Sequence, residues 1–258
     1  MNGNGCARYV YCVVRANDKL SLGNIGLDAN EVYTLPCDGL CAVAHTCSKA
    51  PYSSDSEEMV RGWVISHQQV VKAAQNKFGA VLPMRFNTII QDTVKDSADS
   101  NVLRWLADEG TELKKKLARL QDLEEYGVQI FWEPKVIASM LSRTHPEIAR
   151  LQAEIESKTL GLAYMNKQRL EKLLRQEVER EAECYFKDFY RRIRENVAEL
   201  KIEGIKRDGD KQMLMNLSCL VVIGGPQRLS DELQKIENID GFSVRFTGPW
   251  PPYSFVTG

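Results

Sequence analysis

The sequence lacks the long apolar runs, the one-sided charge and the regular cysteine pattern that mark several classes of protein. No apolar stretch approaches the roughly 20 residues that span a bilayer, and the start of the chain has no basic segment typical of a signal peptide. The 34 basic and 35 acidic residues nearly cancel, which argues against non-specific nucleic-acid binding. Seven irregularly spaced cysteines do not suit a secreted disulfide framework. These absences predict a cytoplasmic protein with free thiols and no membrane insertion.

Fingerprints of catalysis and of cofactor binding are also missing. The stretch VVIGGPQRLSDEL (221–233) predicts a strand, a turn at Gly224-Gly225-Pro226 and a helix. A helix N-terminus after such a turn can bind phosphate. The turn lacks the Lys and Ser/Thr of a P-loop and the three glycines of a dinucleotide site, so a plain tight turn is favoured. No pair of carboxylates stands out, and we expect neither a catalytic residue nor a cofactor.

The best candidate for a metal site is the cluster Cys37, Cys41, His45 and Cys47. Three of its members would share one face of a strand. Zinc needs four ligands that converge as a tetrahedron, whereas ligands along one strand diverge by about 6.6 Å for every two residues. We therefore expect buried cysteines and no metal.

His67 lies on the apolar face of an expected helix, with no serine, cysteine or acid placed beside it by local spacing. A general base is one interpretation. A core histidine that is hydrogen-bonded to its neighbours is the favoured one, because buried polar groups normally find partners.

The first half of the chain predicts an α+β domain. Strands are expected at 7–15, 31–36 and 39–47, a loop at 17–30, and an extended segment at 80–90. A helix begins within SSDSEEM (53–59) and ends at Gly79, and a second helix covers about 97–122.

The second half predicts a strand at 127–134, helices over about 135–203 and the order strand, strand, helix, strand after them. Breaks in the helical region are expected near Thr144–Pro146 and Thr159–Gly161. An apolar stripe in the last helix has a near-helical period and should be buried; it comprises Leu170, Leu174, Val178, Ala182, Tyr185, Phe189, Ile193, Val197 and Leu200.

These patterns predict an α+β fold of two domains, 1–124 and 125–258. The first would be a ferredoxin-like variant. The second would be a βαββαβ domain in which the first helical connection is enlarged into long, coiled-coil-like helices at about 135–203.

The end of the chain, GPWPPYSF (248–255), is rich in proline and aromatic residues. Prolines stop the preceding strand and favour an extended path, while Trp250, Tyr253 and Phe255 present large apolar surfaces. One hypothesis is a clasp that folds back on the protein and could link the two domains, and the other is a strip that binds a partner. The clasp is favoured because exposed aromatic strips promote aggregation.

This tail, TGPWPPYSFV, resembles the signature of the gas vesicle GvpF/GvpL family. Other segments that resemble the family occur in the same order: RYVYCVV at the start, AVAH, the helix with His67, LPMRFNT (82–88), GLAYMNKQRLE (161–171) and MNLSCLVV (215–222). Asn87 stands where the family often has glycine, and asparagine tolerates a left-handed backbone better than most residues. The cysteine cluster is not a feature of the family.

The resemblance implies a non-enzymatic accessory protein of gas vesicle formation. It would bind the hydrophobic shell protein, other accessory proteins, or both, during nucleation and assembly. The residues that the resemblance offers as an interaction site or clasp are Gly248, Pro249, Trp250, Pro251, Pro252, Tyr253 and Phe255 in the tail, with Pro83, Arg85 and Phe86 in the LPMRFNT segment.

Two other hypotheses stay open from the residues. One is an enzyme that binds a small ligand or nucleotide at the 224–226 turn. The other is a helical scaffold that self-associates through its long helix.

Overall fold

A computed structural model describes residues 7–157, 160–205 and 212–256 of the chain. It divides the protein into two compact units, one of Met1–Glu125 with Pro249–Gly258, and one of Tyr126–Gly248. Each unit is an α+β structure with its own sheet and its own hydrophobic core. The units are described separately below.

The first unit is built on a six-stranded sheet in the order β2-β3-β4-β1-β5, with β6 also paired to β1. The strands are β1 (Ala7–Arg15), β2 (Ser21–Gly23), β3 (Val32–Cys37), β4 (Leu40–Cys47), β5 (Val81–Pro83) and β6 (Ile89–Gln91). β1 is antiparallel to β4, β5 and β6, and a bulge between Val10 and Cys12 shifts its register with β4. Because β1 is central, almost every residue in it is buried.

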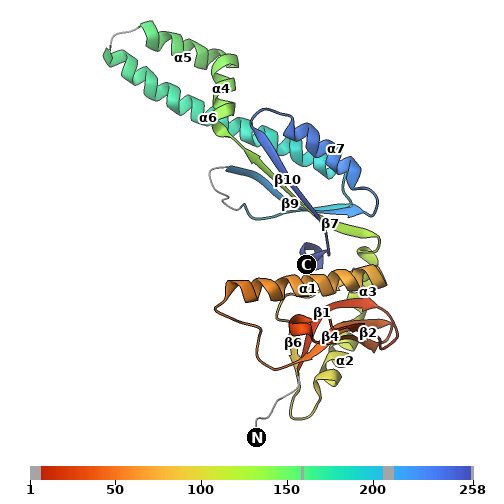
Figure 1. The fold of residues 1–258 in the computed structure, drawn as a ribbon. Coiled ribbons are helices and arrows are strands. Elements are labelled where there is room, and N and C mark those ends of the chain that lie inside the picture. The colour runs from red at the N-terminus through yellow and green to blue at the C-terminus, as the bar shows by residue number, and fades with distance from the viewer. Residues whose placement is uncertain (1–6, 158–159, 206–211, 257–258) are drawn as a thin grey trace. The chain divides into compact units, whose positions relative to one another are not determined.

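Helices cover both faces of this sheet (Figure 1). They are α1 (Glu57–Phe78), α2 (Ala98–Asp108) and α3 (Gly110–Arg119), with a short turn, η1 (Leu27–Ala29), before β3. The expected start and end of α1 are confirmed, because the Ser56 side chain accepts a hydrogen bond from the Met59 N–H and Gly79 ends the helix at φ 82°. α1 packs its apolar stripe on β1 and β5.

Three expectations for this unit need correction. Four strands precede the first helix, so the order of elements is not that of a ferredoxin-like variant. The helix expected over 97–122 is two helices, separated at Glu109 just before Gly110, a residue that weakly supports helix. The 17–30 loop contains β2 and η1.

The second unit holds a four-stranded sheet in the order β10-β7-β9-β8. Its elements are β7 (Leu123–Trp132), α4 (Pro134–Thr144), α5 (Pro146–Ser157), α6 (Leu160–Arg194), β8 (Glu199–Ile202), β9 (Gln212–Val222), α7 (Pro226–Glu237) and β10 (Phe242–Trp250). α5 lies along α6, and α6 and α7 pack side by side (Figure 1). The expected break before Pro146 is confirmed, since His145 has an extended backbone. The expected break at Thr159–Gly161 falls partly outside the described residues.

All nine residues of the long apolar stripe pack in or against the core of the second unit. Phe189 and Ile193 are fully buried there, as expected, and the other seven are partly buried. The helix itself ends at Arg194, earlier than expected, where the Asn196 side chain binds the Arg192 carbonyl; Val197 and Leu200 reach the core from the following loop and from β8.

The tail differs from the expected domain map, because Pro249–Gly258 belongs to the first unit. It is also not extended throughout, since Tyr253–Val256 forms one helical turn, α8. The physical reason is a set of apolar and polar anchors in the first unit, formed by buried Phe255 and by hydrogen bonds to Glu125, Lys116 and Arg119.

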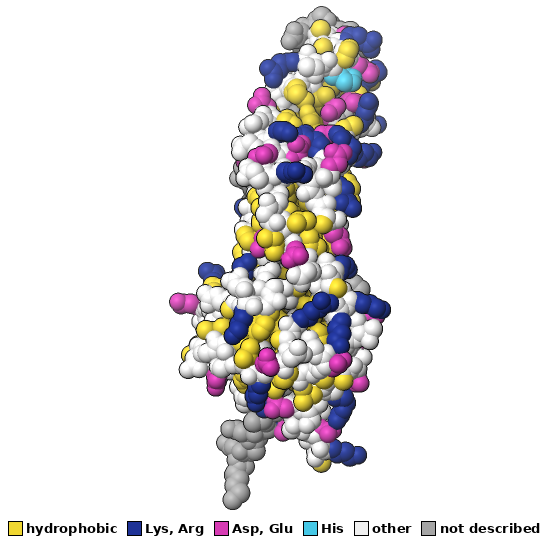
Figure 2. Space-filling view, turned by 90° about the vertical axis from the view of Figure 1, so that its right-hand side faces the viewer, with side chains coloured by type: hydrophobic (Ala, Val, Ile, Leu, Met, Phe, Trp, Pro, Cys, Tyr) yellow, Lys and Arg dark blue, Asp and Glu magenta, His cyan; other side chains and the backbone are white. Residues whose placement is uncertain are grey.

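Over the described residues, no helix has both the length and the apolar content needed to cross a bilayer. Basic and acidic side chains are intermixed on the face seen in Figure 2, as expected for a nearly neutral chain.

Candidate interaction site

The structure brings two of the signature segments together in the first unit, although they lie far apart in the sequence. Pro83 ends β5, and α8 packs against that strand. Phe86 and Tyr253 both approach the His67 ring, with ring centres 6.0 and 6.3 Å from it. LPMRFNT and the tail therefore meet at one buried histidine. We call this histidine and the hydrogen-bonded rings around it the His67 cluster, which comprises His67, His45, Tyr9, Tyr11 and Tyr52.

His67 is held by two hydrogen bonds. Its Nε2 lies 3.1 Å from the Met84 carbonyl oxygen, which can only accept, so Nε2 carries the proton. Nδ1 then accepts from the Tyr9 hydroxyl at 2.8 Å. Burial lowers the pKa of His67 to about 4, because a charged imidazole would lose its hydration. The expected core histidine is confirmed in its position, since only 2% of the side chain is exposed.

His45 forms a second, parallel arm of the cluster. Its Nδ1 lies 2.7 Å from the Tyr11 hydroxyl and its Nε2 lies 3.0 Å from the Tyr52 hydroxyl. The Tyr11 hydroxyl accepts from the Leu27 N–H, so its own proton is available to His45 Nδ1. Burial lowers the pKa of His45 to about 4 and raises the pKa of Tyr52 to about 12. The cluster is thus a network of neutral groups.

Asn87 connects the LPMRFNT turn to this network. Its backbone has φ 66°, a left-handed conformation that asparagine tolerates better than most residues. Its side chain accepts from the Tyr52 N–H at 2.9 Å and donates to the Tyr52 carbonyl at 3.0 Å. Its own N–H donates to the Tyr9 hydroxyl. The asparagine therefore adds two side-chain hydrogen bonds that glycine could not make.

The tail is fastened to the first unit by polar groups at both ends of α8. Glu125 accepts from the Ser254 N–H at 2.9 Å and from its hydroxyl at 2.7 Å. At the other end, Lys116 and Arg119 in the last turn of α3 donate to the carbonyls of Val256 and Phe255. These bonds satisfy backbone groups that a single helical turn leaves open.

The apolar anchor of the tail is Phe255, which is 2% exposed, together with buried Pro251 and Pro252. Trp250 is 43% exposed, so this aromatic residue of the tail, unlike Phe255, is not buried. The reason is its place at the end of β10, before the chain turns into α8. Arg85 is also exposed, and its carbonyl closes the turn by accepting from Thr88.

The cysteine cluster does not gather its members around a common point. The Cys37 thiol donates to the Leu103 carbonyl, and Cys41 to the Ala16 carbonyl. His45 uses both nitrogens for tyrosines. Within the described part of the chain, no group of three or more histidine, cysteine or acidic side chains is arranged to hold a metal ion.

The Gly224-Gly225-Pro226 turn is closed by its own backbone. The Gly225 N–H donates to the Val222 carbonyl, and Pro226, the first residue of α7, has no N–H to offer. Gly224 has φ 82°, which explains a glycine there without a ligand.

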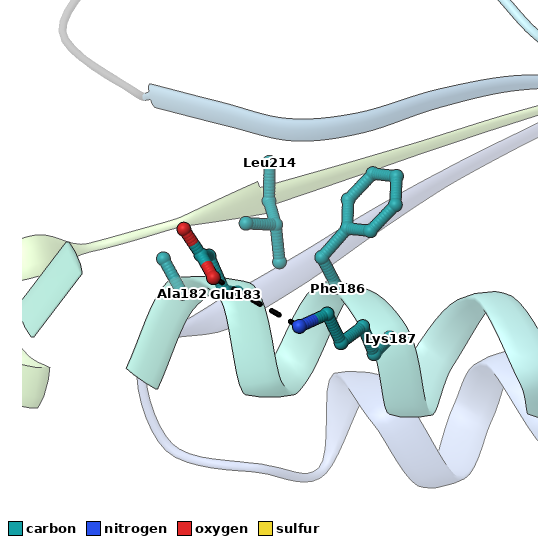
Figure 3. Close-up of a pocket in the computed structure, with 5 residues that line it drawn as sticks. All are labelled: Ala182, Glu183, Phe186, Lys187 and Leu214. Carbon is teal, nitrogen blue, oxygen red and sulfur yellow. Dashed lines mark ion pairs between the residues drawn. The ribbon is translucent and has the colours of Figure 1, made fainter. Parts of the chain in front are cut away.

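The second unit contains a shallow apolar cavity of about 250 Å³ between α6 and β9 (Figure 3). Ala182, Phe186 and Leu214 form its walls, while Glu183 and Lys187 pair across its rim at 3.9 Å. Both charged side chains of that pair are largely exposed to solvent.

Sequence reasoning missed most partners in the His67 cluster. Tyr9, Tyr11 and Tyr52 looked like ordinary strand or loop residues. Lys116, Arg119 and Glu125, which bind the tail, lie in the charged stretch KKKLARLQDLEE (114–125), where no local pattern distinguishes them from their neighbours. The available signal was the spacing of Tyr9 and Tyr11, which places both on the face of β1 that meets α1.

Comparison with known proteins places these features in a family. Residues 7–257 match the sequence model of "Gas vesicle synthesis protein GvpL/GvpF". Gas vesicle protein L of Haloferax mediterranei is 31% identical over 237 residues, which cover 89% of this chain and 72% of that protein. Gas vesicle protein L1 of Halobacterium salinarum is 29% identical over 261 residues, covering 96% and 89% of the two chains.

Solved structures agree on the fold. The crystal structure of GvpF from Anabaena sp. PCC7120 superposes with a TM-score of 0.76 at 19% identity, over 97% of this chain and 98% of that one. GvpF from Microcystis aeruginosa gives a TM-score of 0.68, also at 19% identity, over 97% and 99%. The resemblance seen in the tail and in LPMRFNT thus extends over nearly the whole chain, and the protein belongs to the GvpL/GvpF family of gas vesicle proteins, with a role in gas vesicle formation.

Proposed function

We propose that this protein is a non-enzymatic accessory protein that binds the hydrophobic shell protein of the gas vesicle, other accessory proteins, or both, during nucleation and assembly. The observation that carries the proposal is the family match over residues 7–257. The chemistry of the buried histidines supports it. Both are neutral and fully engaged with tyrosines or a backbone carbonyl, so neither is poised as a general base.

The protein would work in the cytoplasm and associate with growing vesicles. The order of elements and the strand order β10-β7-β9-β8 support a ferredoxin-like second unit, in which α4, α5 and the outer part of α6 are an insertion. Self-association through these helices is compatible with this role.

We propose further that the tail is chiefly a clasp, with Phe255 as its apolar anchor and with Glu125, Lys116 and Arg119 as its polar anchors. On this proposal Trp250→Ala leaves capture of the shell protein unchanged. If the Trp250→Ala variant melts like the wild type but no longer captures the shell protein, the tail is a partner-binding strip instead.

Two experiments test the main proposal. Deletion of the gene should leave cells without normal gas vesicles, and the purified protein should capture the purified shell protein. Normal vesicles in the deletion strain would overturn the proposal, as would the absence of binding to every gas vesicle protein of the same organism.

A further inference from the structure

The outward face of α1 combines exposed apolar side chains with an exposed glycine. Met59 and Ile65 are 51% and 46% exposed, and Gly62 lies between them. Glu58, Gly62, Ile65 and Gln69 are spaced i, i+4, i+7 and i+11, so they form one line along the helix opposite the stripe that packs on the sheet. Such a line is normally filled with charged or polar residues.

Gly62 is an unfavourable choice for the fold of the protein itself. Among residues in a helix interior, only proline is worse than glycine. Glycine is justified where a side chain would clash, but a Cβ at Gly62 would meet nothing within 4 Å. Its backbone is helical, so no left-handed conformation requires glycine either. Within the described residues the fold thus gives no reason for this glycine, and a missing side chain would help a segment that approaches α1 from outside.

The charges around this line are mostly negative. Asp55, Glu57 and Glu58 lie at its N-terminal end, and Arg61 is the one basic residue between 55 and 70. Among the residues that the structure describes, none forms an ion pair with Glu57 or Glu58. Their negative charge stabilises the N-terminus of the helix through the helix dipole, and it also favours binding of a positively charged partner.

We propose that the outward face of α1, centred on Gly62, docks an amphipathic helix of another gas vesicle protein, one that carries apolar residues flanked by Lys or Arg. Gly62 lets the two helix backbones approach closely, and Met59 and Ile65 pack on either side of the contact. Met59 is unbranched and flexible, and so adapts to the partner surface. This inference rests on the proposed function, since it names the kind of segment that the protein binds.

The test compares two alanine substitutions in α1. Gly62→Ala adds one methyl group at the contact, and Asn76→Ala is the control, an exposed position on the same line of α1 but near its other end. Both changes favour helix, so each should raise the melting temperature by about 1–4 °C. Each variant is then titrated on a biosensor against the purified gas vesicle proteins of the same organism.

We expect Gly62→Ala to bind its partner about tenfold or more weakly, because a methyl group at a close helix contact forces the backbones apart. Asn76→Ala should bind as the wild type does. Glu58→Lys should also weaken binding, and more so at low salt, because it replaces attraction by repulsion.

Three results would overturn the inference. Unchanged binding by Gly62→Ala would show that nothing approaches the helix closely there, while the proposed function would stand. A lower melting temperature for Gly62→Ala would show that the fold itself needs the glycine. If the wild type binds none of the gas vesicle proteins, the proposed function fails together with the inference. Unchanged binding by Gly62→Ala, by contrast, overturns the inference alone.

Discussion

The two units of this protein hold their cores together in different ways. The first unit buries His45, His67, Thr34 and Glu125, and it links its histidines to tyrosines by hydrogen bonds. The second unit buries leucine, isoleucine and phenylalanine around α6, and Ser218, at 7% exposure, is the only polar residue among its described, buried residues. A buried hydrogen bond forms only between specific partners in specific protonation states, whereas an apolar core requires only side chains whose volumes fill the space. The first core should therefore respond to pH and the second should not.

The largest effect should come from the apolar core. Phe189 is fully buried in α6 and touches Tyr185 and Phe242. Phe189→Ala should lower the free energy of unfolding of the second unit by about 3–5 kcal/mol, through lost burial and a cavity. Hydrogen exchange, followed peptide by peptide, should show the loss in α6 and β9 and little change in β1 and β4. An equal loss in both units would show that they unfold together.

The next effect separates the two aromatic residues of the tail. Phe255→Ala should destabilise the first unit by about 3 kcal/mol, because its ring is buried beside the polar anchors. Trp250→Ala should cost less than about 1 kcal/mol, since the side chain is 43% exposed. Urea unfolding of both variants measures the difference. Equal losses would mean that Trp250 contributes as much to the clasp as Phe255 does.

The third effect is the pH dependence of the first core. Burial lowers the pKa of His45 and of His67 from about 6.5 to about 4, so the unfolded state binds protons first as the pH falls. The stability that the two neutral histidines provide is complete above about pH 6.5 and is lost progressively towards pH 4. Between pH 7 and pH 5 the loss should be about 2 kcal/mol per histidine.

Hydrogen exchange at pH 7 and pH 5, corrected for the intrinsic rates, should show this loss in β1 and α1. His67→Gln removes one titrating group and should reduce the slope by about one proton. The same pH change should leave protection in the core of the second unit nearly unchanged. An equal acid response in α6 would remove the distinction between the two cores.

The smallest effect concerns the left-handed turn. Asn87→Gly keeps φ 66° accessible but loses the two hydrogen bonds to Tyr52. This loss should lower the free energy of unfolding by about 1 kcal/mol. Asn87→Ala loses the bonds and also strains the backbone, which should cost about 1 kcal/mol more. Thermal unfolding of the two variants measures this order. If glycine were as harmful as alanine, the backbone conformation would contribute nothing to the choice of residue.

Local patterns in the sequence determined most of the elements. The helix from Glu57 to Phe78 could be predicted because Ser56, the acids after it, the apolar period and Gly79 all agree. The stripe from Leu170 to Ile193 could be predicted because a helix that packs on its neighbours with one side carries its apolar residues at the helical period. The break before Pro146 follows from the chemistry of one residue. In each case the physical cause acts between residues close in the chain.

Only the tertiary structure decided which distant residues meet. No local pattern reveals that Tyr253 packs on His67, or that Lys116 and Glu125 fasten the two ends of α8. A hydrogen bond between groups more than a hundred residues apart leaves no period in the sequence, because its geometry comes from the packing of whole elements. Trp250 and Phe255 are both large aromatic residues of the same tail, yet Trp250 is nearly half exposed and Phe255 is buried. That difference depends on where β10 ends and on where the pocket for α8 lies, and both are set by the fold.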